Sequence, residues 1–73
     1  MTIIERDNLA KAYMSAWYAV EGRPVSVKTL PNGWFEKQHQ GYSLVDKVRA
    51  SSLLEGLVTL TRRLEVKSKE VTA

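Results

Sequence analysis

The segment VSVKTLPNGWFE, residues 25–36, has the pattern of a β-hairpin. Its first part alternates valine with polar residues, which is the period of a strand whose two faces differ. Pro31 follows, then Asn32 and Gly33, and this order predicts a type I turn with Gly33 in the left-handed conformation of a G1 bulge. A second strand should therefore begin at Trp34 and run antiparallel to the first.

The turn also fixes the pairing of the two strands, because it places Leu30 opposite Trp34 and so determines every pair before it. Side chains then fall alternately on two faces of the hairpin. The face expected to lie inward carries Val25, Val27, Thr29 and Phe35. The face expected to lie outward carries Ser26, Lys28, Leu30, Trp34, Glu36 and Gln38.

A capping box predicts the first helix, because Thr2 and Glu5 can satisfy backbone donors that are left open at a helix start. The helix is expected over residues 3–21, since Gly22 and the nearby Pro24 stop it. Its apolar side chains share one face, which predicts that the helix packs on the sheet. This face carries Leu9, Tyr13, Ala16, Trp17 and Val20.

A second capping box, formed by Ser52 and Glu55, predicts that the last helix begins at about residue 53. The helix is expected to end near residue 65 or 67. One face of it is a leucine stripe, which predicts a second element packed on the core. The stripe consists of Leu53, Leu57, Leu60 and Leu64.

Residues 42–49 alternate between apolar and polar side chains and predict a third strand. The alternative, in which the last helix starts as early as Leu44, conflicts with the later capping box. The order is then α-β-β-β-α, an α+β fold in which a three-stranded antiparallel sheet has two helices packed on one face. Residues 1–66 are expected to form a single small domain, and residues 67–73 a frayed tail.

Composition narrows the class of protein further. The chain has 73 residues, no cysteine and a single histidine, His39, which excludes a disulfide framework, a Cys/His zinc site and cysteine catalysis. No apolar run approaches the roughly 20 residues of a membrane span, and residues 1–10 lack the apolar stretch of a signal peptide. A soluble cytoplasmic protein with no membrane partner is expected.

The pattern of polar residues does not favour catalysis. His39 is the only candidate general base, and it lies between two glutamines at the polar end of a strand, where a solvent-facing side chain is expected. The carboxylates share no metal-ligand spacing, and the glycines form no phosphate-binding loop. No enzyme activity, cofactor or metal site is therefore predicted.

An interaction surface is expected on the outward face of the hairpin, where Leu30 and Trp34 form an apolar pair. Tryptophan and arginine are enriched among the hot spots of protein interfaces. Arg49 of the third strand falls on the same face as Trp34. The alternative is that Trp34 folds over the hairpin as structural padding. The predicted partner-binding residues are Lys28, Leu30, Trp34, Glu36, Lys47 and Arg49.

Leu54 and Val58 define a second candidate surface, because they widen the leucine stripe of the last helix. They could form a homodimer or helix interface. Assembly through these two residues is one hypothesis about function, beside the two that are given below. The alternative is that the rest of the domain covers the whole stripe.

Two segments, VKTLPNGWFE at residues 27–36 and VRASSLL at residues 48–54, resemble a pattern in small uncharacterised accessory proteins of bacteriophages and prophages. The resemblance covers residues 24–66. It implies a short phage gene whose product binds a host or phage macromolecule in a bacterial cell and changes its activity.

The leading hypothesis is a small non-enzymatic protein that inhibits or adapts a host or phage protein by stoichiometric binding.

The alternative is a DNA-binding regulator, because the β-β-β-α order resembles the sheet-reading domains of phage integrase arms and of plant transcription factors. Cations of the sheet would then approach phosphates or base edges, whereas a net charge of only +3 and the position of Glu36 on that face count against it. The cations are Lys28, Lys37, Lys47 and Arg49.

Overall fold

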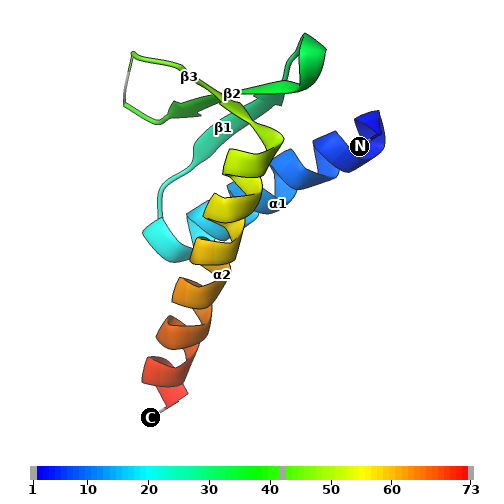
Figure 1. The fold of residues 1–73 in the computed structure, drawn as a ribbon. Coiled ribbons are helices and arrows are strands. Elements are labelled where there is room, and N and C mark those ends of the chain that lie inside the picture. The colour runs from blue at the N-terminus through cyan, green and yellow to red at the C-terminus, as the bar shows by residue number, and fades with distance from the viewer. Residues whose placement is uncertain (1, 42, 73) are drawn as a thin grey trace.

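The computed structural model describes the backbone of residues 2–41 and 43–72 and the side chains of residues 2–41 and 43–67. The elements are α1 (Ile3–Glu21), β1 (Val25–Thr29), a short 3-10 turn (Pro31–Gly33), β2 (Trp34–His39), β3 (Asp46–Arg49) and α2 (Ala50–Thr72) (Figure 1). The strands form one antiparallel sheet in the order β1-β2-β3. The predicted α+β fold, with its α-β-β-β-α order, is therefore confirmed.

The hairpin of β1 and β2 has the predicted register. Thr29 lies opposite Phe35, and each earlier residue of β1 lies opposite the next residue of β2. The Leu30 amide donates a hydrogen bond to the Trp34 carbonyl oxygen at 2.8 Å and closes the hairpin. Alternation along β1 and β2 then places Phe35 on the inner face, where it is fully buried.

The turn between β1 and β2 differs from the predicted type at one residue. Gly33 is left-handed as expected, with φ 79°, but Asn32 is left-handed too, with φ 64° and ψ 23°. A type I turn would instead hold this residue at a φ of about −90°. Asparagine tolerates the left-handed region because its short side chain can bond locally to the backbone, so a Pro-Asn-Gly order permits this geometry as well.

α1 begins and ends at the predicted residues. The Thr2 hydroxyl oxygen accepts a hydrogen bond from the Glu5 amide at 3.1 Å, and the Glu5 carboxylate accepts one from the Thr2 amide at 3.4 Å. Gly22 ends the helix in the left-handed conformation, with φ 71°. The residues predicted for the packed face are all buried or half-buried: Leu9, Tyr13, Ala16, Trp17 and Val20.

The boundary between the third strand and the last helix was predicted wrongly. β3 begins only at Asp46, residues 43–45 precede it without regular structure, and Tyr42 lies outside the described residues. α2 begins at Ala50, so the capping box at residues 52–55 lies inside the helix rather than at its start. Strand pairing explains the shift, because Arg49 still pairs with β2 and the helix starts at the next residue.

α2 also runs past the end predicted near residue 65 or 67 and reaches Thr72. Residues 57–72 contain neither glycine nor proline, so nothing in the sequence interrupts the backbone hydrogen bonds of the helix there. The segment expected as a tail, residues 67–73, thus continues α2 as far as Thr72, and Ala73 lies outside the described residues.

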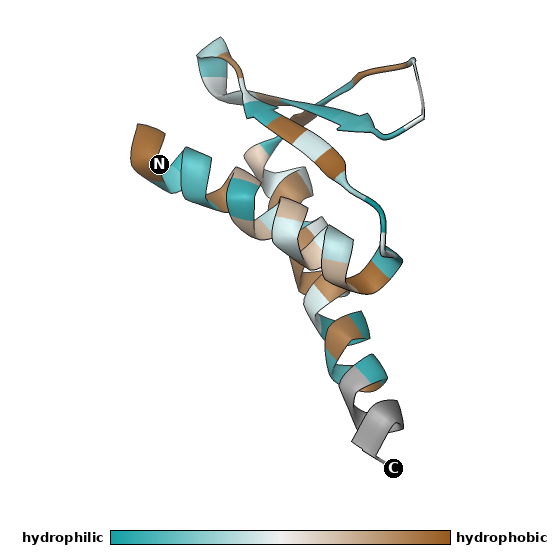
Figure 2. Cartoon of the chain, turned by 180° about the vertical axis from the view of Figure 1, so that it is seen from behind, coloured by the Kyte–Doolittle hydropathy of each residue, from teal (hydrophilic) through white to brown (hydrophobic). Residues whose placement is uncertain are grey.

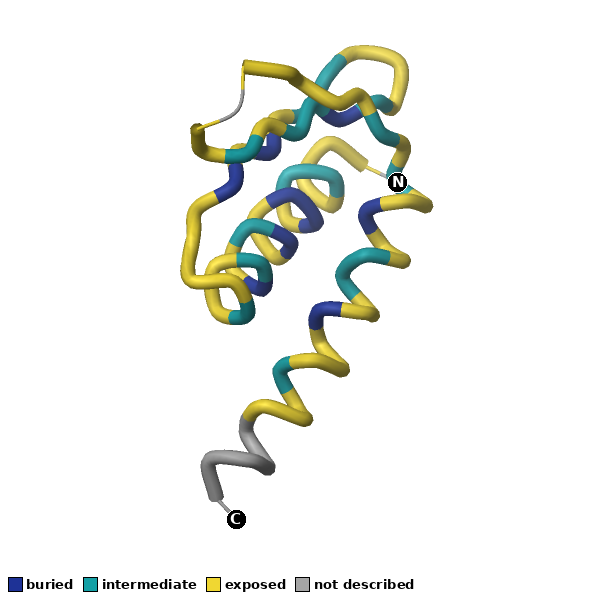
Figure 3. Tube along the Cα trace, turned by 90° about the vertical axis from the view of Figure 1, so that its left-hand side faces the viewer, coloured by how far each residue is buried: buried dark blue, intermediate teal, exposed yellow. Residues whose placement is uncertain are grey.

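The core lies between the inner face of the sheet and the two helices. Phe35 is 0% exposed, and the buried leucines of the α2 stripe belong to the same cluster. Gly56 lets the helices approach closely, since a Cβ atom there would meet Cε2 of Tyr13 at 2.9 Å. α1 lies beneath the sheet, and α2 crosses α1 and continues beyond it, where its described residues are mostly exposed (Figure 3).

Candidate partner-binding surface

The six predicted partner-binding residues lie together on the face of the sheet that points away from the helices. Residues directly opposite each other in an antiparallel sheet share a face. Glu36 lies opposite Lys28 of β1 and Lys47 of β3, and Trp34 lies opposite Arg49. The residue between Trp34 and Glu36 is the buried core phenylalanine, so their side chains point outward. We call this set the outer surface: Lys28, Leu30, Trp34, Glu36, Lys47 and Arg49.

A hollow of about 710 Å³ opens beside Trp34 at the tip of the hairpin. Trp34 and Leu30 are half-buried, so the indole is neither sealed inside the fold nor fully exposed. A purely structural role explains why Trp34 is partly buried, but it does not explain why Trp34 also lines an open hollow. The lining residues are Leu30, Pro31, Asn32, Trp34 and Lys47.

Cations surround the indole on the outer surface. The guanidinium carbon of Arg49 lies 4.6 Å from the centroid of the Trp34 ring, a contact that contributes about 0.5–1 kcal/mol at exposed sites. Across the sheet, the Glu36 carboxylate stands in a row between Lys28 and Lys47. The outer surface therefore combines a partly apolar hollow with three cations and one carboxylate.

Arg6 of α1 holds the tip of the hairpin in place. Its Nη2 atom donates hydrogen bonds to the Leu30 carbonyl oxygen and to the Trp34 carbonyl oxygen, the latter at 3.2 Å. The guanidinium carbon also lies 5.4 Å from the centroid of the Phe35 ring. One side chain thus links both ends of the turn to the core.

A second link joins α1 to the end of β1, where the Thr29 hydroxyl donates a hydrogen bond to the Asp7 carboxylate at 3.2 Å. Sequence reasoning missed both this aspartate and Arg6. A signal was available for Arg6, because it precedes Leu9 by three residues and Tyr13 by seven, which puts it on the packed face of the helix.

Two polar residues of β2 lie on the inner face and correct the predictions made for them. The Lys37 Nζ atom lies 5.6 Å from the centroid of the Tyr13 ring, so this lysine does not join the cations of the outer surface. His39 does not face solvent as predicted, because its ring packs on Trp17 with the ring centroids 4.7 Å apart. The period of two explains both positions, since Lys37 and His39 follow the buried Phe35 by two and four residues and so share its face of the sheet.

The second candidate surface, on α2, is open. Leu54 is 45% exposed and Val58 is 52% exposed. The alternative that the domain covers the whole leucine stripe is therefore wrong. Both side chains are accessible to a second copy or to a partner helix.

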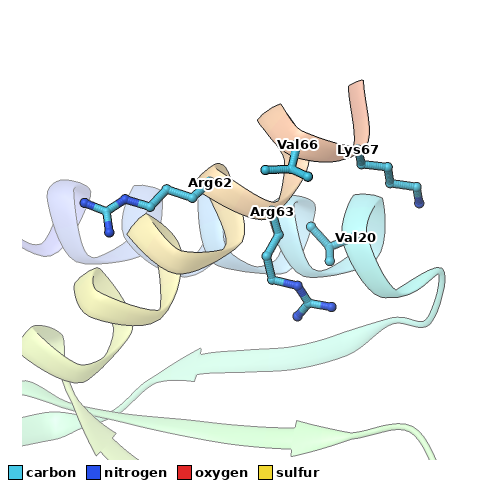
Figure 4. A pocket seen from close by; sticks show the side chains of 5 residues that line it. All are labelled: Val20, Arg62, Arg63, Val66 and Lys67. Carbon is cyan, nitrogen blue, oxygen red and sulfur yellow. The ribbon is translucent and has the colours of Figure 1, made fainter. Parts of the chain in front are cut away.

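Another hollow, of about 460 Å³, lies between the end of α1 and the outer part of α2 (Figure 4). Its cations contact groups of α1: Arg63 pairs with Glu21 at 2.7 Å, and the Lys67 Nζ atom donates to the Ala19 carbonyl oxygen at 3.4 Å. Figure 4 shows that these two side chains and Arg62 point in different directions. The cations thus complement the carboxyl end of α1 and do not converge on one point where an anion would bind.

Within residues 2–41 and 43–67, no three histidine, aspartate or glutamate side chains gather closely enough to hold a metal ion. Over their described residues, neither helix has both the length and the apolarity that crossing a membrane requires.

Comparisons of the chain with protein-family models, with curated proteins and with solved structures find no match. The candidate site therefore rests on the geometry of its own residues.

Proposed function

We propose that this protein is a small non-enzymatic binding protein that modulates a partner protein by stoichiometric binding through the outer surface. The observation that carries the proposal is the partly apolar hollow beside Trp34, with the Arg49 guanidinium lying over the indole. Tryptophan and arginine are the residue types most enriched among the hot spots of protein interfaces.

Binding through this surface has a simple physical basis. An apolar side chain of the partner fills the hollow beside Trp34 and displaces water from it. The cations around the hollow favour an acidic partner and accelerate its approach. Because Arg6 already holds the tip in place, little conformational freedom is lost on binding.

The resemblance of residues 24–66 to phage accessory proteins supports a particular setting. In that setting the protein acts in the cytoplasm of a bacterial host, and its partner is a host or phage protein that it inhibits or adapts. Assembly into a homodimer through Leu54 and Val58 is compatible with this role, since these residues lie on α2 and the outer surface lies on the sheet.

DNA binding through the sheet is the second candidate function, because Lys28, Lys47 and Arg49 lie on one face. The position of Lys37 on the inner face and of Glu36 among the cations weakens it. A salt titration separates the two functions, because duplex binding through two or three phosphates weakens by about tenfold or more between about 50 and 200 mM salt.

Capture from a bacterial lysate tests the proposal with two matched variants. Trp34→Ala removes the indole of the outer surface, and Tyr18→Ala removes an exposed aromatic ring of α1. We expect the unchanged protein and Tyr18→Ala to retain the same partner protein and Trp34→Ala to lose it, with circular dichroism unchanged. Equal retention of that protein by both variants would contradict the proposal.

A further inference from the structure

The sheet ends in two edge strands, β1 and β3. The hydrogen bond from the Leu30 amide to the Trp34 carbonyl oxygen identifies a pair whose backbone groups face each other. Along an antiparallel strand, residues alternate between directing their amide and carbonyl groups toward the neighbouring strand and directing them away from it. The amide and carbonyl groups of Val25 and Val27 therefore point away from β2 at the β1 edge. The same alternation across β2 directs the amide and carbonyl of Lys47 outward at the β3 edge.

The two edges differ in how far they are covered. Val25 and Val27 of β1 are each only 5% exposed, and α1 packs against this strand. Lys47 of β3 is exposed, and β3 lies on the side of the sheet farthest from α1 (Figure 1). An edge strand with accessible backbone groups is a template for pairing with another chain. Of the two edges, β3 is therefore the one that is open to a partner.

Apolar side chains lie beside this open edge. Figure 2 shows hydrophobic residues in the loop that leads into β3. Leu44 is 82% exposed there, and its neighbour Val45 is exposed as well. Exposed apolar side chains of this kind are typical of places where a second segment packs.

We propose that the β3 edge accepts an extended strand of the partner protein that runs antiparallel to β3 and in which acidic side chains alternate with apolar ones. The inference rests on the proposed function, since it names the chemistry of the same partner at the sheet edge that adjoins the outer surface. The acidic side chains lie on the outer face beside Lys47 and Arg49, because opposite charges on adjacent strands stabilise the pair. The apolar side chains lie on the inner side beside Val48. Main-chain hydrogen bonds give affinity, and the side chains give specificity.

A second copy of this chain fits the same edge poorly. If two β3 strands pair antiparallel about Val48, Lys47 lies opposite Arg49 of the copy. If they pair about Lys47, two lysines lie opposite each other. Like charges in directly opposite positions are destabilising, and lysine on an edge strand is a common means of preventing self-association. The charges therefore select an acidic strand over self-pairing.

The test uses the whole protein and a short synthetic peptide that alternates glutamate with valine. NMR spectroscopy reports the chemical shift and the hydrogen exchange of the Lys47 amide. We expect the peptide to slow this exchange, because the amide gains a hydrogen-bond acceptor. A peptide that leaves the exchange of the Lys47 amide unchanged at its highest concentration would overturn the proposal.

Two N-methylated peptides test whether main-chain hydrogen bonds form. In one, the methyl groups are on the glutamate amides, which face β3 in the proposed pairing. In the other, they are on the valine amides, which face away from it. Methylation of the glutamate amides should weaken binding by about tenfold or more, whereas methylation of the valine amides should leave the affinity unchanged. Equal affinities of the two peptides would rule out strand addition.

Charge is tested with a peptide that alternates lysine with valine. This peptide should bind about tenfold more weakly than the glutamate peptide, and Lys47→Glu should reverse the preference. Lys11→Glu, on α1, is the control and should leave the preference as it is. If Lys47→Glu does not fold, Lys47→Gln takes its place and should narrow the difference between the peptides. A preference that neither substitution alters would contradict the role of Lys47.

Two outcomes separate this inference from the proposed function. If the hydrogen exchange of the Lys47 amide slows as the protein concentration rises without peptide, a second copy occupies the β3 edge and the inference is wrong. If the peptides protect Lys47 but Trp34→Ala still captures the same partner protein, the proposed function fails while strand addition stands.

Discussion

Asn32 holds the least common backbone conformation at the tip of the hairpin. It is a non-glycine residue with φ 64°, and it is followed by Gly33 with φ 79°. These two residues reverse the chain and bring Leu30 opposite Trp34, which creates the hollow of the outer surface. The sequence identifies Gly33 as left-handed by its residue type. It does not identify Asn32, because a Pro-Asn-Gly order suits more than one turn.

Asn32→Val should lower the free energy of unfolding by about 1–2 kcal/mol, because a β-branched residue is strained in the left-handed region. Asn32→Gly is the matched control, since glycine adopts this conformation without strain and should change stability by no more than about 0.5 kcal/mol. Urea denaturation measures both variants. A valine variant as stable as the glycine variant would mean that Asn32 is not left-handed.

Arg6→Met should lower the free energy of unfolding by about 1–3 kcal/mol, because two carbonyl oxygens of the turn lose a charged donor. Arg23→Met is the control, since Arg23 is exposed and should change stability by about 0.5 kcal/mol or less. Urea denaturation of the two variants gives the comparison. Similar losses in both would show that Arg6 does not anchor the hairpin.

Among the elements, the hairpin and α1 could be predicted closely, whereas the start of α2 could not. The hairpin register follows from three consecutive turn residues, and the limits of α1 follow from a capping box and a glycine. Both signals are local. The start of α2 depends instead on how far β3 pairs with β2, which is a contact between distant parts of the chain. A capping-box sequence inside a helix is identical to one at its start, so Ser52 wrongly predicts the first residue of α2.

The crossing of α1 and α2 depends on a position without a side chain. Gly56→Val should lower the free energy of unfolding by about 2 kcal/mol or more, because the added atoms overlap the buried ring of Tyr13. Thr59→Val is the control, since it introduces the same side chain at an exposed position of α2. Thermal or urea denaturation measures the losses.

A double-variant cycle checks the contact directly. The double variant Gly56→Val, Tyr13→Leu should lose less free energy of unfolding than the sum of the losses in the two single variants, because the smaller leucine makes room for the valine. Additive losses would mean that the two positions do not touch.

For the whole molecule, the residues of the outer surface could be predicted as a group because they follow from strand pairing alone. Once Leu30 lies opposite Trp34, the faces of Lys28 and Glu36 are determined. Arg6 could not be placed in the same way, since its partners are carbonyl groups of a turn more than twenty residues away. The stacking of His39 on Trp17 is equally non-local. The sequence pattern therefore predicts which residues form the outer surface but not the tertiary contacts that hold the sheet in place.

The exposed face of α2 gives a prediction for the state of assembly. Leu54→Ser combined with Val58→Ser should change the free energy of unfolding of a monomer by about 1 kcal/mol or less, because both side chains already contact solvent. Sedimentation and denaturation over a range of protein concentrations measure the effect. A larger loss that grows with protein concentration would show that these residues pack in an assembly.

Binding through Trp34 and its hollow can be measured by titration calorimetry of the purified partner protein against Trp34→Ala and Tyr18→Ala. If this surface binds the partner, Trp34→Ala loses about 2 kcal/mol or more of binding free energy, about thirtyfold in affinity, while Tyr18→Ala binds like the unchanged protein. A folded Trp34→Ala variant that binds the partner with unchanged affinity would contradict binding through this surface.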